Sequence, residues 1–425
     1  MIKLTYFGEE QIVYYEKLDN GLEVFIAPNK MVNSYRVDLV AKLGASVTEF
    51  IPVKEKEYIK MPLGTAHFLE HKLFDTKDGD ATFLFDDAGV VTNASTNYYY
   101  TNYFIEGKKQ FKKNLNLFLD VFYTPYFEKD RIENEKGIIG EEIDMYIDDP
   151  DWVLYRIEKE SVFNKALKDE VAGTRETISE INADILEKVY NTFYQPSNTF
   201  LVISGKVNPK EALDIIKSNE SIKKRMSNYP VIFKKIHEDL PVNREYGEGT
   251  GLVVIPKLSY YFKYDVNEFK FLSPEKFKAY LNILFYILFG DGSDFSEKIH
   301  EEKIANYFYI DTMYYENIYI IGICGESEYA DIFKDEIDKT LENLQINKDD
   351  FEREIKVRNS IIIRELDNIS DVSYSIIRSI INRGKYIDDK EILDSLKYEE
   401  FLAVIKKLSF DNKAFNLLLP KEKKS

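Results

Sequence analysis

The chain has 425 residues, of which 44% are hydrophobic and 31% are charged, a composition that excludes a disordered or collagen-like protein. Its 57 basic and 74 acidic residues give a net charge of −17, so we expect no nucleic-acid partner and no affinity for an anionic membrane. A single cysteine, Cys324, excludes an internal disulfide, and the four histidines limit any metal site that uses several of them. The length predicts two or three domains.

The N-terminal segment lacks the apolar stretch of a signal peptide, and no apolar run is long enough to span a membrane. Glu9, Glu10 and Glu16 interrupt the N-terminal segment where a signal peptide needs an apolar stretch. The longest apolar run, at residues 280–290, is shorter than the roughly 20 residues that cross a bilayer. The sequence therefore predicts a soluble, cytoplasmic protein with no membrane partner.

The first half of the chain alternates between strand and helix patterns. Asn20-Gly21 between two apolar runs is typical of a β-hairpin, and apolar residues at helical spacing mark the helices. The expected elements in chain order are strands over 12–18, 22–27 and 35–43, a helix after Gly64, a strand-like block over 92–106, helices over 111–123 and 129–146, one more helix around 178–189, and a strand over 199–204.

The second half repeats the order of these elements at a spacing of about 220 residues. The matching segments are a strand over 317–326, a helix over 332–344, a helix from Phe351, and a final helix and strand before Pro420. Four matched elements in order indicate a duplication. We therefore predict an α+β protein with two homologous α/β domains, each a mixed or antiparallel sheet flanked by helices, over residues 1–217 and 251–425 with a charged linker over 218–250.

Two histidines and a glutamate form the clearest chemical pattern in the chain. His67 and His71 are four residues apart, and Glu70 precedes the second histidine. On a helix these positions share one face, so both imidazoles can reach one metal ion with the carboxylate beside it. His-x-x-Glu-His is the inverted zincin motif, and zinc needs a third protein ligand, for which a carboxylate is expected because no other histidine lies nearby. A helix with two surface histidines is the alternative.

Several stretches resemble the pitrilysin family of zinc peptidases, which includes insulinase and the mitochondrial processing peptidases. They are GTAHFLEHKLF, GVVTNASTNYYYTNYF, ENEKGIIGEEIDMYIDDPDW, AGTRETI and FYQPSNTFLVISGKV, and they cover most of the first half. The resemblance is closest to bacterial single-chain members of about this length, and it implies one Zn²⁺ per chain. Matching these stretches to the family's motifs indicates which residues of this chain would bind zinc and act in catalysis.

In the family, the third zinc ligand is a glutamate on a later helix, seven residues after another glutamate. Glu142, seven residues after Glu135, fits this spacing, and the adjacent Glu141 is the rival. The resemblance implies that Glu70 is the general base. It also implies that Glu135 supports a histidine or the ligand-bearing helix, although a solvated helix carboxylate is nearly as good an interpretation.

Substrate-binding residues are also implied by the resemblance. Asn93, Ala94 and Ser95 match an edge strand that pairs with an extended peptide, while an ordinary buried strand is the alternative. In its second half the family often carries an arginine and, after six residues, a tyrosine that together hold the substrate backbone. Here His300 and Tyr307 occupy these positions, and the helix before them lacks histidine, so we expect a second half without catalytic activity. A solvated His300 is equally compatible with the pattern.

The resemblance implies a zinc-dependent endopeptidase that cleaves short or unfolded peptides held as an extended strand in an enclosed chamber. The alternatives are a processing subunit for one dedicated precursor peptide and a non-catalytic scaffold subunit of the same family. A histidine, unlike an arginine, does not carry a fixed positive charge at physiological pH, so His300 replaces the arginine poorly. We therefore expect a dimer, more readily with a metal-free paralogue that carries the Arg-Tyr pair than with a second copy.

Overall fold

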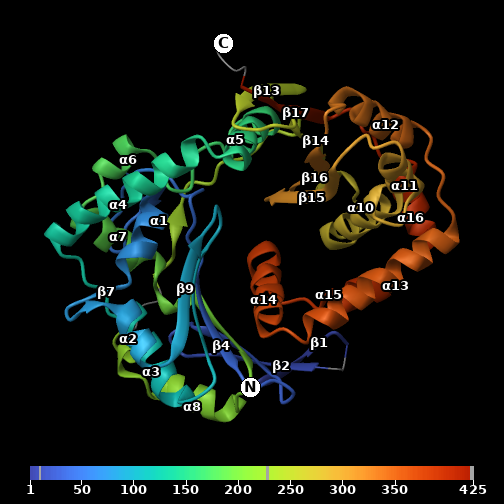
Figure 1. Ribbon diagram of the computed structural model, residues 1–425. Helices are drawn as coiled ribbons and strands as arrows, with labels where there is room; N and C mark the ends of the chain where they lie inside the picture. Colours follow the sequence, from blue (N-terminus) through green and yellow to red (C-terminus); the bar gives the residue numbers. More distant parts are fainter. Residues whose placement is uncertain (9–10, 226–228, 422–425) are drawn as a thin grey trace. The chain divides into compact units, whose positions relative to one another are not determined.

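The computed structural model describes residues 1–8, 11–225 and 229–421, which form two compact units (Figure 1). The first unit comprises Met1–Ile143, Asp169–Lys235 and Ile362–Asp389, and the second comprises Asp144–Lys168, Ile236–Ile361 and Lys390–Ser425. The acidic residues 9 and 10 and residues 226–228 of the expected linker lie outside the described residues. Within the described ranges, no helix is long and apolar enough to cross a lipid bilayer.

The first unit is built on a seven-stranded mixed sheet. In spatial order its strands are β1 (Ile2–Tyr6), β2 (Gln11–Lys17), β3 (Glu23–Pro28), β11 (Thr199–Gly205), β4 (Tyr35–Ala41), β10 (Thr101–Gly107) and β9 (Val90–Thr96). Only the β3–β11 pair is parallel among these neighbours. The predicted hairpin is confirmed, since Tyr14 of β2 pairs with Ile26 of β3. The predicted strand-like block proves to be the antiparallel pair of β9 and β10.

Both faces of this sheet are covered, which explains why every residue of β4 is buried. Successive side chains of a strand point to opposite faces. Val37 and Leu39 belong to the larger core on the face that carries α3 and α7, whereas Val40 packs with Ile376 and other apolar residues of α14. Figure 1 shows α14 along one face of the sheet and the other helices of this unit on the opposite face.

The helices of the first unit are α1 (Thr65–Lys72), α2 (Ala81–Asp87), α3 (Phe111–Tyr123), α4 (Lys129–Ile147), α6 (Arg175–Ser179), α7 (Ala183–Phe193), α8 (Pro209–Ser218), α9 (Glu220–Lys224) and α14 (Ile369–Arg383). The expected helices after Gly64 and over 111–123 and 129–146 are confirmed, whereas α2, α8 and α9 were not expected. The single helix expected around 178–189 is wrong, because the chain forms α6 and then restarts as α7. The side chain of Asn182 accepts a hydrogen bond from the Ile185 amide and so caps the new helix.

Short strands complete the first unit. They form a three-stranded sheet of β12 (Ile232–Phe233), β5 (Glu49–Ile51) and β6 (Ile59–Lys60), and a pair of β7 (Asp75–Thr76) and β8 (Gly79–Asp80). The segment expected to be a linker thus contains α9, β12 and, further on, most of β13 (Tyr246–Gly251).

The second unit repeats the sheet topology of the first. Its strands, in spatial order, are β13, β17 (Lys413–Pro420), β14 (Lys257–Asp265), β16 (Ile318–Glu326) and β15 (Tyr307–Tyr315). This order matches β3, β11, β4, β10 and β9, and the one parallel pair, β13–β17, stands in the equivalent place. The predicted duplication and α+β fold class are therefore confirmed.

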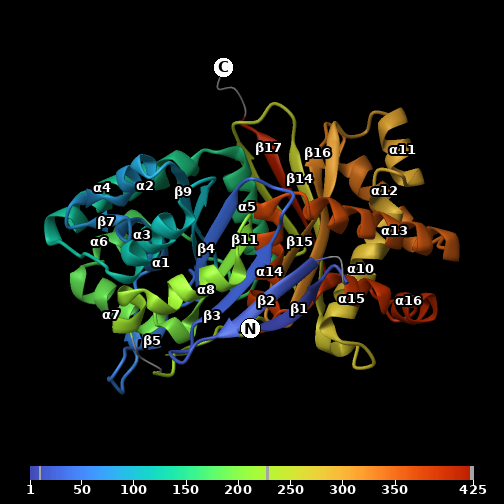
Figure 2. The ribbon, with the colours of Figure 1, turned by 90° about the horizontal axis from the view of Figure 1, so that it is seen from below.

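The helices of the second unit include one from the first half of the chain. They are α5 (Pro150–Val162), α10 (Pro274–Phe289), α11 (Asp294–Glu301), α12 (Ala330–Glu342), α13 (Lys348–Glu365), α15 (Asp389–Asp394) and α16 (Tyr398–Ile405). In Figure 2, α5 lies against β14 and β17, and it packs on β13 as well. In the same way α14, from the second half, packs on β11 and β4 of the first unit. The contiguous ranges 1–217 and 251–425 stay a prediction of where the two repeats begin and end. The compact units do not follow these ranges, because the second unit includes α5 and the first includes α14.

Candidate metal centre

The helix α1 carries the His-x-x-Glu-His motif and is anchored at its start by a close backbone approach. Gly64 precedes α1 with a φ of 86°, which suits glycine, and a Cβ there would lie 2.3 Å from the carbonyl oxygen of Ala172. Phe68 and Leu69 are fully buried in the core. This burial leaves His67 and His71 one above the other, with ring centroids 4.7 Å apart.

The helix α4 brings a carboxylate to these two imidazoles. Glu142 Oε1 lies 3.7 Å from His67 Nε2, and Glu142 Oε2 lies 3.7 Å from His71 Nε2. One ligand atom from each of the three residues falls within 4.8 Å of the others, and within the described residues no other group of this kind is found. Glu141 is exposed on the adjacent face of α4 and does not belong to the group.

Glu135 contacts the rear of this group. Its Oε1 lies 3.0 Å from His71 Nδ1, and its Oε2 accepts a hydrogen bond from Lys72 Nζ at 3.3 Å. A metal-binding histidine usually donates its second ring N–H to a carboxylate, which orients the ring and leaves the lone pair of Nε2 for the ion. The solvated carboxylate considered above does not describe Glu135, whose side chain is only 14% exposed.

The two histidines differ in how readily they lose the proton that competes with a metal ion. Burial, together with the charge of His71, lowers the pKa of His67 to about 4, so this imidazole is neutral at pH 7 with a lone pair available. Burial also disfavours the charged form of His71, but the hydrogen bond that His71 donates to Glu135 and the charges of Glu70, Glu135 and Glu142 outweigh it and raise the pKa of His71. A metal ion must therefore displace a proton from His71. Two imidazoles and one carboxylate, with Glu135 on the second ring nitrogen of His71, are the donor set of a catalytic zinc site.

Glu70 lies on the same helix but outside the candidate ligand group. It is 9% exposed, and burial raises the pKa of its carboxyl above the ordinary value despite a hydrogen bond from Thr96 Oγ1 to Oε2 at 2.5 Å. The sequence interpretation missed Thr96 and Lys72. Thr96 stands in the stretch that carried the resemblance, but only the sheet register turns its side chain towards α1.

The strand β9 forms one edge of the seven-stranded sheet. It pairs with β10, and none of the described strands pairs with its other side. Asn93 and Ser95 are exposed and Ala94 is half-buried, so the ordinary buried strand considered above does not describe this segment. Thr96, the last residue of this edge strand, donates a hydrogen bond to Glu70.

His300 and Tyr307 belong to the second unit. His300 is exposed near the end of α11, with its ring centroid 6.2 Å from that of Phe308. Tyr307 begins β15, and its hydroxyl donates to Glu326 Oε1 at 3.1 Å. Lys257 Nζ lies 3.1 Å from the same oxygen, so Tyr307 shares its acceptor with a lysine.

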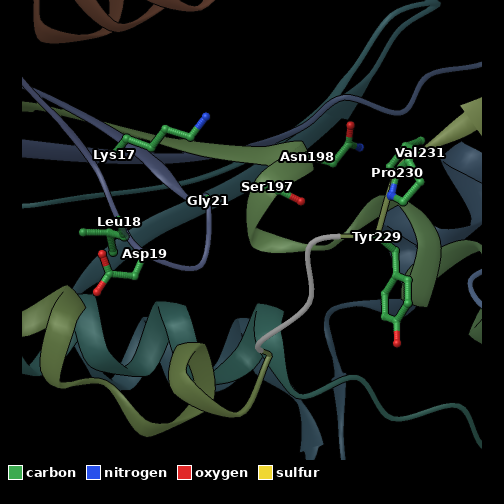
Figure 3. Close-up of a pocket in the computed structure, with 9 residues that line it drawn as sticks. All are labelled: Lys17, Leu18, Asp19, Gly21, Ser197, Asn198, Tyr229, Pro230 and Val231. Atoms are coloured by element: carbon green, nitrogen blue, oxygen red, sulfur yellow. The ribbon is translucent and has the colours of Figure 1, made fainter.

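A cavity of about 570 Å³ elsewhere in the first unit contains none of the candidate residues. Its lining includes Lys17, Asp19, Ser197, Asn198 and Tyr229, which Figure 3 shows around an open space beside the β2–β3 turn. A lone carboxylate and no histidine line it, so it does not compete with α1 and α4 as a metal centre.

Comparison with known proteins finds two family models and several relatives that match the chain. The family model described as "Insulinase (Peptidase family M16)" matches residues 54–175, and "Peptidase M16 inactive domain" matches residues 180–357. The uncharacterized zinc protease YmfH of Bacillus subtilis is 36% identical over 307 residues, which cover 71% of this chain and 71% of that protein.

Two solved structures share the fold. An M16-like peptidase from Alicyclobacillus acidocaldarius superposes with a TM-score of 0.87 at 23% identity, covering 99% of this chain and all of that one. The first half of the periplasmic protease PqqL from Escherichia coli superposes with a TM-score of 0.72 at 18% identity, covering 96% and 92% of the two chains. At these identities the likeness concerns the fold alone.

Proposed function

This chain belongs to the M16 (insulinase) family of peptidases, and on that premise we propose that it is a zinc-dependent endopeptidase with its centre on α1 and α4. The observation that carries the proposal is the convergence of His67, His71 and Glu142 from two helices distant in sequence. These three residues would hold the zinc ion. The non-catalytic scaffold is the less favoured alternative, because a scaffold needs neither this group nor the buried Glu70 beside it.

Zinc in such a site acts as a Lewis acid and lets water serve as a nucleophile near pH 7. Glu70 takes the proton from the attacking water and passes it to the leaving amine. Because its pKa is raised by burial, its carboxyl lies closer to the working pH than an exposed glutamate would, which favours both steps. Thr96 stabilises the carboxylate form by its hydrogen bond. Glu135 positions His71 through its contact with Nδ1.

Substrate binding is proposed to use the free edge of β9. The unpaired backbone groups of an edge strand can pair with an extended peptide, and the small side chains of Ala94 and Ser95, next to Asn93, leave room for the approach. A folded protein rarely offers a free strand of this kind, so short or unfolded peptides are the expected substrates. The enclosed chamber and a dedicated precursor peptide stay predictions, and a peptide library distinguishes broad from single-substrate cleavage.

The experiment that tests the proposal separates metal binding from proton transfer. Glu70→Gln should keep about one equivalent of zinc while peptide hydrolysis falls by about two to four orders of magnitude, the usual contribution of a general base. His67→Ala should lose both zinc and hydrolysis. Wild-type protein that holds zinc but cleaves no member of a quenched peptide library would favour the scaffold. Substantial hydrolysis by Glu70→Gln would contradict the assignment of the base.

The proposed partner and location need separate tests. The expected partner is a metal-free paralogue that carries the Arg-Tyr pair. In this chain Tyr307 already has a positive charge near it, because Lys257 and the Tyr307 hydroxyl contact the same oxygen of Glu326. Light scattering with peptide assays on the purified chain decides the question. Full activity from a monomer would contradict a dimer, and activity that appears only with an added paralogue would support it. Cell fractionation tests the expected cytoplasmic location.

A further inference from the structure

Lys72, the residue directly after the His-x-x-Glu-His motif, has an almost completely buried side chain. Only 1% of the side chain is exposed, although an ammonium group is costly to remove from water unless it is paired. Its Nζ contacts Asp75, donates to Glu135 Oε2 at 3.3 Å and donates to the carbonyl oxygen of Arg131 at 3.4 Å. The proposed function gives this buried cation no role.

The two oxygens of Glu135 have different partners. Oε1 faces His71 Nδ1 at 3.0 Å, and Oε2 faces Lys72 Nζ at 3.3 Å. A carboxylate held at both oxygens cannot rotate without losing one contact. The side chain of Lys72 therefore restrains Glu135, and Glu135 restrains the imidazole ring of His71.

The two carboxylates that contact Lys72 do not depend on it equally. Asp75 has a second cation, since its Oδ1 lies 3.7 Å from Arg131 Nη1. Among the ion pairs of the described residues, Glu135 has only His71 and Lys72 as partners. Loss of the ammonium would therefore leave Asp75 paired but would leave Glu135 with His71 alone. His71 also faces Glu142, whose Oε2 lies 3.7 Å from His71 Nε2.

We propose that Lys72 is a positioning residue of the metal centre, which acts through Glu135 to hold the ring of His71 in its ligating orientation. This inference rests on the proposed function of α1 and α4 as a zinc site. Without Lys72, Glu135 is free to turn away from His71 or towards the ion. In either case the ion meets a less preorganised ligand set.

A purely structural role for Lys72 is the competing explanation, and the second unit offers a matched control. Lys263 and Glu238 form another buried lysine–glutamate pair, with Nζ 2.8 Å from Oε1 and both side chains 0% exposed. None of the three proposed ligands belongs to that unit. Lys263→Met should lower the thermal midpoint without changing zinc affinity, and it shows what loss of a buried pair does by itself.

The test compares metal affinity in the purified full-length chain by competition with a chromogenic chelator, together with the absorption spectrum of the cobalt-substituted protein. Lys72→Met should weaken zinc binding by about 10- to 100-fold, the range typical for loss of a group that supports a ligand, and should change the cobalt spectrum. Glu135→Gln should do the same, and the double variant should be no weaker than the worse single variant, because both act through one chain of contacts. Lys72→Arg should restore most of the affinity.

Two results would overturn the inference. One is a zinc affinity within about twofold of wild type in Lys72→Met with an unchanged cobalt spectrum, whatever its thermal midpoint. The other is a double variant whose loss is the product of the two single losses. If Lys72→Met does not fold, Lys72→Gln carries the same expected loss. A wild-type chain that binds neither zinc nor cobalt would instead overturn the proposed function itself.

Discussion

Replacing Thr96 with valine removes the hydroxyl that donates to Glu70 Oε2 at 2.5 Å but keeps the shape of the side chain. This hydrogen bond lowers the pKa of Glu70, against the larger effect of burial that raises it. Loss of the bond therefore raises the pKa of Glu70 further. The base then becomes protonated, and inactive, at a higher pH than in the wild type.

The size of the effect follows from the burial of the pair. A hydrogen bond to a charged group contributes roughly 1.5–3 kcal/mol, and about 1.4 kcal/mol corresponds to a tenfold change in an equilibrium constant. Because Glu70 is only 9% exposed, water cannot replace the lost donor fully. We expect the acidic limb of the kcat/KM profile to move up by about one pH unit, which makes kcat/KM about tenfold lower at a fixed pH below the limb.

The assay is hydrolysis of a quenched fluorescent peptide over a range of pH, with zinc content measured for each protein. Thr96→Ser keeps the hydroxyl and serves as the control, so its limb should coincide with that of the wild type. Above the limb, where Glu70 is ionised in every variant, the kcat/KM values should converge. An acidic limb that stays in place in a fully zinc-loaded Thr96→Val protein would refute the assignment of Glu70 as the base.

The other predictions concern the ligands. Glu142→Gln should weaken zinc binding strongly, because a neutral amide oxygen is a poorer ligand than a carboxylate, whereas the exposed Glu141→Gln should leave metal content unchanged. The reverse result would make Glu141 the ligand, and the face of α4 that points to the histidines would then differ by about 100° around the helix axis. Zinc affinity should also rise by about tenfold per pH unit through pH 6.5, because the pKa of His71 is raised above its ordinary value of 6.5 and the ion displaces that proton. A chelator titration that finds constant affinity between pH 5.5 and 6.5 would contradict this expectation.

Features that depend on neighbouring residues were predictable from the sequence. The placement of His67, Glu70 and His71 on one helix follows from their spacing, since the geometry of a helical turn is the same in any fold. The helix over 111–123 and the hairpin at Asn20-Gly21 were predictable for the same reason. The duplication was visible because both halves use the same order of elements.

The tertiary structure decided the features that join distant segments. Thr96 is 26 residues from Glu70, and Lys72 is 63 residues from Glu135, so only the packing of β9 and α4 on α1 brings these pairs together. The exchange of α5 and α14 between the two units was equally invisible, because an amphipathic helix shows in its sequence that it has an apolar face but not which sheet covers it. Hydrophobic burial is non-directional, and the choice among possible partners is made by the shape of the whole core. The sequence by itself therefore determined the motif and the repeat, while the tertiary structure decided which side chains support the motif.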